Sequence, residues 1–406
     1  MFEKIKRKIS HNIALLTKSI LIILSKKSRF AFGINEFISV MKAATFYSFS
    51  KNDPIYNGIF QRRFEDLFSK YLGGGHARAV NSGTNALYIA IRALNLAKGS
   101  FIGVTPLVDP GVINAIIIAG FKPLLIDIHS KKDLYVSLSE LENAIKSGIK
   151  AFIVVHYYGF ISPIINIKNL CNKYNVKIIE DCSQCHAGKI FNKNVGTFGD
   201  LAIFSTMSRK SLITGGSGGL IFTKNINTFK KINSFADRGK NTFQDGLDLR
   251  LCSTNKEISL NFNTNEFASA IGISSLKRLE KCTKKRVSLA IKIAQEVEKI
   301  DFLTIAKFNK NDCPFIIPLF ANKKYHLIIK DVFEIYNIDF SMTYDQCASF
   351  WPWLKPYLDI ENNTSNAKTF AKGHILLYIH EGYNNFYFIC LKKAFKLIQK
   401  RSIQLN

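Results

Sequence analysis

The sequence predicts an α/β protein with a large, mostly parallel sheet and a smaller α+β domain at its carboxyl end. Apolar strand and helix patterns alternate from about residue 77 to about residue 225, which is typical of parallel strands covered by helices. Two clear strand candidates are the apolar runs at 151–155 and 177–179. After about residue 265 the pattern changes to a long helix, from Asn265 to about Glu298, followed by short strands and helices.

The length and composition allow two domains with a substantial core. The chain has 406 residues, of which 47% are hydrophobic, and contains no internal repeat or long low-complexity linker. We therefore divide it into a basic N-terminal extension (1–44), a large domain (45–280) and a small C-terminal domain (281–406).

The segment around Lys210 is the strongest single indication of chemistry. An apolar strand runs into Ser205, Lys210 follows five residues later, and a glycine-rich turn follows at 215–219. A lysine that forms a Schiff base must be held in place, partly desolvated and close to groups that can bind a phosphate. The alternative for this segment alone is a solvated lysine in a turn.

Asp181 lies upstream of Lys210, at the carboxyl end of the short apolar strand 176–181. A carboxylate in this place suits the partner of a pyridinium nitrogen, which pyridoxal phosphate (PLP) chemistry requires because the protonated ring accepts electrons. The alternative is an ordinary aspartate at a strand end that caps the next helix.

A turn of small residues at 81–87, with sequence NSGTNAL, opens an apolar-periodic helix. Helix N-termini offer unpaired backbone amides and a positive dipole end, so this turn can hold a phosphate. By itself it could also be a simple helix cap. The order of glycine turn, strand-end Asp181 and Lys210 is far more specific than any one of these features.

With these features the chain resembles the DegT/DnrJ/EryC1/StrS aminotransferases, which are PLP enzymes of fold type I that mostly aminate keto-sugars on nucleotide carriers. The resemblance covers roughly residues 45–395. Its motifs stand in the family's order at 64–68, 81–87, 119–123, 155–159, 180–186, 196–200, 204–210 and 261–272.

The resemblance implies a role for individual residues. Lys210 would form the Schiff base with PLP and then carry the proton, Asp181 would pair with the pyridine nitrogen, and Gln184 would lie against the ring. Asn261 would reach the phosphate of the other subunit, so the resemblance also implies a homodimer with shared active sites. The remaining cofactor-binding residues would be Gly83, Thr84, Asn85 and Ser205.

Two positions depart from the family pattern. Asp109 stands at or near the place of the aromatic residue that usually stacks on the cofactor ring, and a carboxylate cannot stack. Asn263 stands where the family usually has arginine, two residues after Asn261. Both positions are expected near the substrate, so we take Asp109, together with His186, as candidate substrate contacts.

The resemblance implies a reaction in which an amino donor, by analogy glutamate, aminates a nucleotide-linked keto-sugar for surface polysaccharide or related amino-sugar synthesis. One alternative is a PLP-dependent sugar dehydratase, but related dehydratases have histidine in place of the lysine, so Lys210 argues against it. A second alternative is a non-catalytic, regulatory relative, which the departures at Asp109 and Asn263 keep open. Which keto-sugar is the acceptor cannot be read from the sequence.

The spacing of the cysteines and the net charge indicate which ligands and partners to expect. The eight cysteines lack the paired spacing of a metal site, and the single C-x-x-C at Cys182 and Cys185 is a weak signal, so we expect reduced thiols and no metal. The net charge of +26 favours anionic ligands such as a nucleotide diphosphate and the PLP phosphate. The sequence has no nucleic-acid-binding motif, and we expect no nucleic-acid partner.

Residues 1–30 are not explained by the resemblance. They contain eight Lys and Arg residues against the single acid Glu3, and their apolar run is too short, and broken by Lys18, for a transmembrane helix. A helix here could make peripheral contact with an anionic membrane surface or pack on the enzyme. No secretory signal is evident. We therefore expect a cytoplasmic protein, with membrane-surface association as an open alternative.

Overall fold

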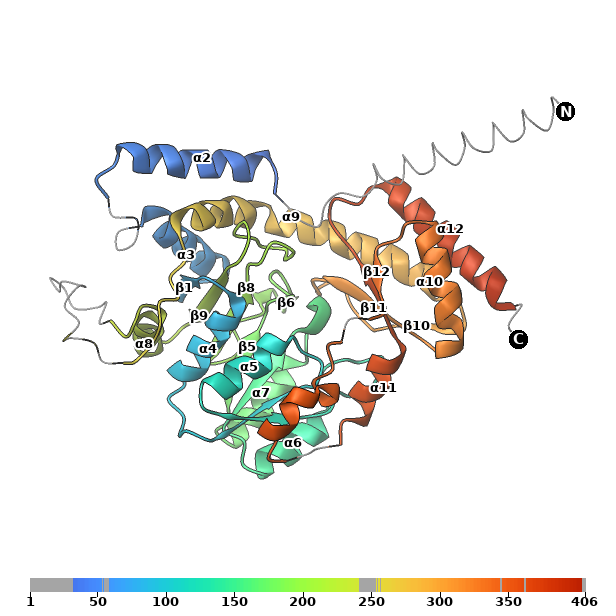
Figure 1. Ribbon diagram of the computed structural model, residues 1–406, viewed down its shortest axis with the longest axis horizontal. Helices are drawn as coiled ribbons and strands as arrows, with labels where there is room; N and C mark the ends of the chain where they lie inside the picture. The colour runs from blue at the N-terminus through green and yellow to red at the C-terminus, as the bar shows by residue number, and fades with distance from the viewer. Residues whose placement is uncertain are drawn as a thin grey trace.

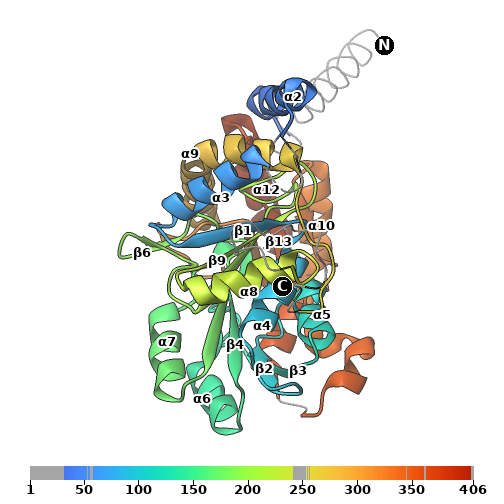
Figure 2. The ribbon, with the colours of Figure 1, turned by 90° about the vertical axis from the view of Figure 1, so that its left-hand side faces the viewer.

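The computed structural model describes residues 32–403, apart from residues 53, 55–57, 241–252, 254, 256, 344 and 361–362. Its centre is a seven-stranded sheet (Figures 1 and 2). The strands β8, β5, β4, β2 and β3 run parallel to one another, and β9 runs antiparallel to both of its neighbours, β1 and β8. In spatial order the strands are β1 (His76–Val80), β9 (Gly219–Thr223), β8 (Leu201–Ser205), β5 (Lys177–Asp181), β4 (Ala151–Val155), β2 (Phe101–Val104) and β3 (Lys122–Leu125).

Helices cover both faces of this sheet, as parallel strands require. On one face α4 (Gly83–Ala93), α5 (Pro110–Ile118) and α8 (Ile226–Ala236) share a core with strand residues such as Ile153 and Ile179. On the other face, α6 (Leu138–Lys146) and α7 (Ile164–Lys173) pack on the alternate strand residues Phe152 and Ile178. The predicted mostly parallel sheet and its strands at 151–155 and 177–179 are confirmed.

The C-terminal part forms a second layer of sheet and helices. Its four antiparallel strands lie in the order β10 (Leu303–Ile305), β11 (Ile316–Ala321), β13 (His374–Tyr378) and β12 (Phe340–Ser341). The helices α10 (His326–Ile335) and α12 (Asn385–Ser402) pack on this sheet, and α11 (Ser365–Gly373) precedes β13. A small hairpin of β6 (Lys189–Ile190) and β7 (Lys193–Asn194) lies apart from both sheets.

One long helix, α9 (Glu266–Val297), joins the two parts and runs along the top of the molecule in Figure 1. The side chain of Asn265 caps its first turn by accepting a hydrogen bond from the Ala268 amide at 2.8 Å. Its first half packs with α3 (Ile59–Tyr71), and its second half enters the core beneath the small sheet. The predicted helix from Asn265 to about Glu298 is therefore confirmed.

The N-terminal helix α2 (Ile34–Phe49) lies on α9 (Figures 1 and 2). Buried polar contacts fix it there: Glu36 pairs with Arg278 at 3.0 Å, and the Tyr47 hydroxyl donates to Glu266 at 2.5 Å. The proposed domain boundaries after residues 44 and 280 fall inside α2 and α9, and the division stays a proposal.

The predicted membrane or packing helix at residues 1–30 lies outside the described residues. Within the described part of the chain, no helix combines the length and the apolar character needed to cross a bilayer. Neither observation distinguishes the two alternatives for residues 1–30.

Candidate active site

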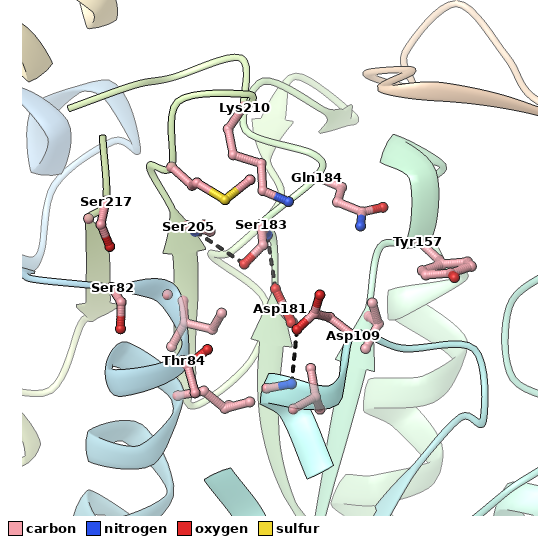
Figure 3. Close-up of a pocket in the computed structure, with 18 residues that line it drawn as sticks. Ser82, Thr84, Asp109, Tyr157, Asp181, Ser183, Gln184, Ser205, Lys210 and Ser217 are labelled. Carbon is pink, nitrogen blue, oxygen red and sulfur yellow. Dashed lines mark hydrogen bonds between the residues drawn. The ribbon is translucent and has the colours of Figure 1, made fainter. Parts of the chain in front are cut away.

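A cavity of about 190 Å³ lies where the carboxyl ends of β4, β5 and β8 meet the N-terminus of α4. This is the edge at which open α/β sheets bind ligands, because loops diverge there and helix N-termini face the opening. Figure 3 shows the Lys210 and Asp181 side chains entering the cavity from opposite ends. Of the ten predicted site residues, those that line it are Gly83, Thr84, Asp109, Asp181, Gln184, Ser205 and Lys210.

Lys210 lies on the loop between the end of β8 and the start of β9. The loop is closed by backbone hydrogen bonds from Thr206 to Gly218 at 2.8 Å and from Ser208 to Gly216 at 2.9 Å. Burial lowers the pKa of the Lys210 amine below its ordinary value, while the carboxylates of Asp181 and Asp109 act to raise it. A lowered pKa increases the fraction of neutral, nucleophilic amine near pH 7.

Asp181 is the last residue of β5 and is 5% exposed. Its Oδ1 accepts a hydrogen bond from the Ser183 amide at 2.9 Å. Burial raises the pKa of this carboxyl, and the hydrogen bonds from Ser183 and the charge of Lys210 oppose that rise. The carboxylate therefore has acceptor capacity left for a cationic N–H group in the cavity.

Glu180, the preceding residue, is fully buried and has its own partners. It accepts hydrogen bonds from the amides of Gly196, Phe198 and Gly199 at 2.9, 2.7 and 2.7 Å, and from His156 Nε2 at 3.2 Å. Burial acts to raise its pKa, but these hydrogen bonds outweigh burial and lower it. Glu180 therefore anchors the end of β5 and, with it, the position of Asp181.

His156, Glu180 and Cys182 also form a group of metal-ligating residue types, with their donor atoms all within 4.8 Å of one another. Two of the three already have hydrogen-bond partners: His156 Nδ1 accepts from the Ser162 amide at 3.2 Å, and its Nε2 donates to Glu180. Cys182 and Cys185 are buried free thiols whose pKa values burial raises. Hydrogen bonding accounts for this cluster, so we assign it no metal.

The start of α4 forms an anion-binding corner of the cavity. Ser82 caps the helix through a 3.1 Å hydrogen bond from the Asn85 amide, and the amides of Gly83 and Thr84 have no partner within the helix. A Cβ on Gly83 would lie 2.7 Å from the Cβ of Ser205, so only glycine lets this turn approach β8 so closely. Hydroxyls of Ser82, Thr84, Ser205 and Ser217 surround the corner (Figure 3).

Asp109 has a local structural role as well as a place in the cavity. It is the N-cap of α5, where its Oδ1 accepts from the Gly111 amide at 2.9 Å, and Pro110 occupies the first helical position. Within the described chain, Tyr157 is the one aromatic residue that lines the cavity. Val112, Val155 and Ile203 give the cavity apolar walls that a flat ring could contact.

Gln184 also faces the cavity. Its Oε1 accepts a hydrogen bond from the Tyr158 amide at 2.6 Å, which fixes the orientation of the side-chain amide and leaves Nε2 as a donor. Gln184 also borders a second, smaller cavity beside Lys210, and both cavities include Asp109. The side chain is therefore placed to donate a hydrogen bond to an oxygen of a bound molecule.

Three predicted site residues do not line the cavity. His186 is buried behind it, where Nε2 donates to the Ser205 carbonyl at 2.7 Å and burial lowers its pKa to about 3. Asn85 donates from Nδ2 to Asn81 at 2.7 Å. Asn261 is exposed and accepts from the Asn263 amide at 3.1 Å. A substrate contact by His186 and cofactor contacts by Asn85 and Asn261 stay predictions.

The sequence reasoning missed several residues that line the cavity. Ser82 and Ser217 belong to the two turns that were already singled out, so the signal was present but was assigned to their neighbours. Ser183 directly follows the strand that ends in Asp181, and Tyr157 lies in a quoted motif without an assigned role. No local pattern marks Met207, which lines the cavity because its loop folds back over β8.

Solved structures share this fold. An aminotransferase from Psychrobacter cryohalolentis superimposes with a TM-score of 0.82 and 20% identity, covering 90% of this chain and 96% of that one. NtdA from Bacillus subtilis, whose structure has the cofactor PMP bound, gives a TM-score of 0.79 at 19% identity over 92% of this chain and 83% of that one. The predicted α/β fold of PLP-dependent transferases is thus confirmed.

Several relatives are named for amino sugars. GDP-perosamine synthase of Vibrio cholerae is 29% identical over 57% of this chain and 61% of its own length. The UDP-4-amino-4,6-dideoxy-N-acetyl-beta-L-altrosamine transaminase of Campylobacter jejuni strain 81-176 is 28% identical over 82% of this chain and 88% of its own. The profile of the DegT/DnrJ/EryC1/StrS aminotransferase family matches residues 38–385. The chain belongs to the DegT/DnrJ/EryC1/StrS aminotransferase family, as the sequence predicted.

Proposed function

We propose that this protein is a PLP-dependent aminotransferase that moves an amino group from an amino acid, by analogy glutamate, to a nucleotide-linked keto-sugar. The observation that carries the proposal is the placement of Lys210 and Asp181 at two ends of one cavity whose third corner is the N-terminus of α4. An amine, a buried carboxylate and an anion-binding helix end are the three groups that PLP requires of its protein.

The residues present fit this cofactor. Its ring supplies an electron sink for the bond that breaks at the reacting carbon of the substrate. Lys210 would bind the cofactor through its amine and carry a proton, and Asp181 would hold the proton on the ring nitrogen. The amides of Gly83 and Thr84 and the hydroxyl of Ser205 would hold the phosphate.

The acceptor class follows from the named relatives and from charge. The Vibrio cholerae and Campylobacter jejuni relatives are named for GDP- and UDP-linked amino sugars. A net charge of +26 favours an anionic nucleotide diphosphate over a neutral sugar. We place the reaction in surface polysaccharide or related amino-sugar synthesis on this basis.

We also propose a homodimer with shared active sites. Asn261 is exposed and does not line the cavity of its own subunit. Exposed apolar side chains flank it, among them Ile258, Leu260 and Phe267. Exposed apolar groups concentrated on one segment favour burial against another protein surface, and a second copy would bring Asn261 to the facing site.

We expect Gly83→Ala to weaken PLP binding by about 10-fold or more, because the added Cβ would force α4 away from Ser205. Gly216→Ala is the matched control, since its Cβ would meet no heavy atom within 4 Å. PLP titration followed by fluorescence would measure both affinities. Equal affinities in the two variants would show that close contact between the turn and β8 is not needed for the cofactor.

Lys210→Ala should reduce transamination by at least about a thousandfold while the protein stays folded, because no neighbouring amine replaces the nucleophile and proton carrier. Lys230→Ala, an exposed change on α8, is the control. Borohydride reduction and peptide mass mapping should locate the cofactor on Lys210 in the wild type. Wild-type turnover in Lys210→Ala would refute the assignment, whereas a wild type that binds no PLP would favour the non-catalytic alternative.

Asp181→Asn should keep PLP bound but lower turnover by about 100-fold or more, since a neutral amide does not hold a proton on the ring nitrogen. The amide can still accept the hydrogen bond from Ser183, so we expect the fold to survive. Turnover and the absorption spectrum of the bound cofactor would be recorded together, with exposed Asp66→Asn as the control. An unchanged spectrum with near-normal turnover would remove Asp181 from the nitrogen site.

Mixing inactive Lys210→Ala with an inactive Asn261→Ala variant should restore about a quarter of wild-type activity after subunit exchange. Half of the dimers would be hybrids, and each hybrid would contain one site with both residues intact. If Asn261 served its own subunit, mixing would restore nothing. Light scattering would establish the oligomeric state, and a fully active monomer would contradict the shared site.

A further inference from the structure

A second cavity, of about 130 Å³, adjoins the cofactor cavity. Lys210 and Asp109 line both of them, so a molecule in the second cavity would lie directly beside the Lys210 amine. The other walls come from the C-terminal part of the chain, with Arg286 from α9, Phe315 from the start of β11 and Tyr378 from the end of β13. Its place beside the Lys210 amine makes this cavity a candidate site for a reactant of the proposed transamination.

Arg286 is the unusual group in this wall, because it is 1% exposed and still has an unused donor. Its Nε and Nη2 donate to one carboxylate oxygen of Glu381, at 2.8 and 2.7 Å. Its Nη1 is buried and has no hydrogen-bond partner in the described part of the chain. Buried donors are nearly always paired, and a charged donor without a partner is costly, so Nη1 is the guanidinium nitrogen that still lacks an acceptor.

The orientation of Arg286 is fixed from behind by an alternating series of charges. Glu381 also accepts from Arg278 Nη1 at 3.4 Å, and Arg278 Nε lies 3.0 Å from Glu36 on the N-terminal helix. Burial acts to raise the pKa of Glu381, but Arg286 and His380 lower it to about 2. Glu381 therefore stays ionised at neutral pH and holds one edge of the guanidinium group.

The Phe315 ring lies near both cationic groups. Lys210 Nζ is 4.9 Å from the ring centroid, and Arg286 Cζ is 5.8 Å from it. Both cations therefore meet the same small cavity wall, one where an amino group would react and the other where an anion would bind. An α-amino acid carries its carboxylate on the very carbon that bears the reacting amine.

We propose that Arg286 binds the α-carboxylate of the amino donor through Nη1. This assignment rests on the proposed transamination and names a substrate-binding residue for it. The guanidinium offers a directional, permanently charged donor, and its pairing with Glu381 keeps that donor in place when no donor molecule is bound. The apolar walls of Phe315, Ile316 and Tyr378 exclude water and strengthen the contact.

The test is a single-turnover measurement of the donor half-reaction. PLP-loaded enzyme is mixed with L-glutamate at increasing concentration, and the cofactor absorbance is followed. Arg286→Lys keeps a cation next to Glu381 but removes the forked donor, so the apparent Kd for L-glutamate should rise about 10- to 100-fold. Arg63→Lys is the matched control, since it is the same change at an exposed position of α3 that lines neither cavity and has no part in the charge series behind Arg286. Its apparent Kd should stay within about twofold.

A second readout does not depend on turnover. Glutarate, a dicarboxylate without an amine, should raise the Tm of wild-type and Arg63→Lys enzyme and should lose this effect in Arg286→Lys. If Arg286→Lys does not fold, the double variant Arg286→Gln with Glu381→Gln removes both charges together and replaces it. Unchanged L-glutamate affinity and unchanged stabilisation by glutarate in the folded variant would overturn the proposal.

The carboxylate could instead belong to an acidic sugar acceptor, and the second half-reaction separates the two sources. Pyridoxamine-loaded enzyme is titrated with a nucleotide keto-sugar, with and without a uronic carboxylate. If Arg286→Lys raised the Kd for the acidic sugar alone and left the affinity for L-glutamate unchanged, the assignment to the donor would be overturned. Failure of the proposed function is distinct from both results, because the enzyme would then bind PLP without any donor-dependent change of absorbance.

Discussion

Buried charge at the carboxyl edge of the large sheet is the constraint on which the rest of this site depends. Alternate residues of a strand point to opposite faces, so the adjacent carboxylates of Glu180 and Asp181 enter different environments. Glu180 points away from α4, and backbone amides and His156 satisfy it. Asp181 points into the cavity, where the charge of Lys210 and the hydrogen bonds of Ser183 offset its burial. The hydrogen bonds of Glu180 are satisfied within the fold, whereas Asp181 keeps acceptor capacity toward the cavity.

Close packing at two glycines shapes the corner of the cavity at the N-terminus of α4. Helix α4 can present its first amides to the cavity only if its N-terminus touches β8, and that contact leaves no space for a side chain at Gly83. A second close approach occurs at Gly219, where a Cβ would lie 2.4 Å from the Ser82 carbonyl oxygen. Two glycines from distant parts of the chain thus bring together the phosphate corner and the loop that carries Lys210, and neither contact depends on side-chain chemistry.

Local patterns were sufficient for most of the fold. The apolar runs of β4 and β5 and the start of the long helix near Asn265 are encoded within a few residues, and all were predicted from the sequence. That Lys210 and Asp181 share one cavity was predictable for the same reason, since each lies next to a strand end. Arg286 could not be found this way, because its partner Glu381 is 95 residues away and only the packing of α9 against the turn after β13 brings them together.

Asp109 shows how a departure from the family pattern can be understood from local structure. As the N-cap of α5 before Pro110, its carboxylate is held by the Gly111 amide, so the residue supports its helix whatever else it does. Its charge also opposes the lowering of the Lys210 pKa by burial. An aromatic residue at this position would stack on a ring but would carry no charge to raise the pKa of the Lys210 amine. At this position the cavity therefore has a second carboxylate near Lys210 in place of an aromatic side chain.

The alternating charges from Glu36 to Arg286 follow a different physical rule. A buried ion-pair series contributes little net stability, because desolvation offsets most of the Coulomb attraction. What such a series does provide is orientation, since each charge restricts the position of the next. Here it connects α2 through α9 to the wall beside Lys210, so the N-terminal helix is part of the framework that positions Arg286. The position of the guanidinium therefore depends on residues far from the cavity, while the Lys210 loop is held by backbone hydrogen bonds next to the ends of β8 and β9.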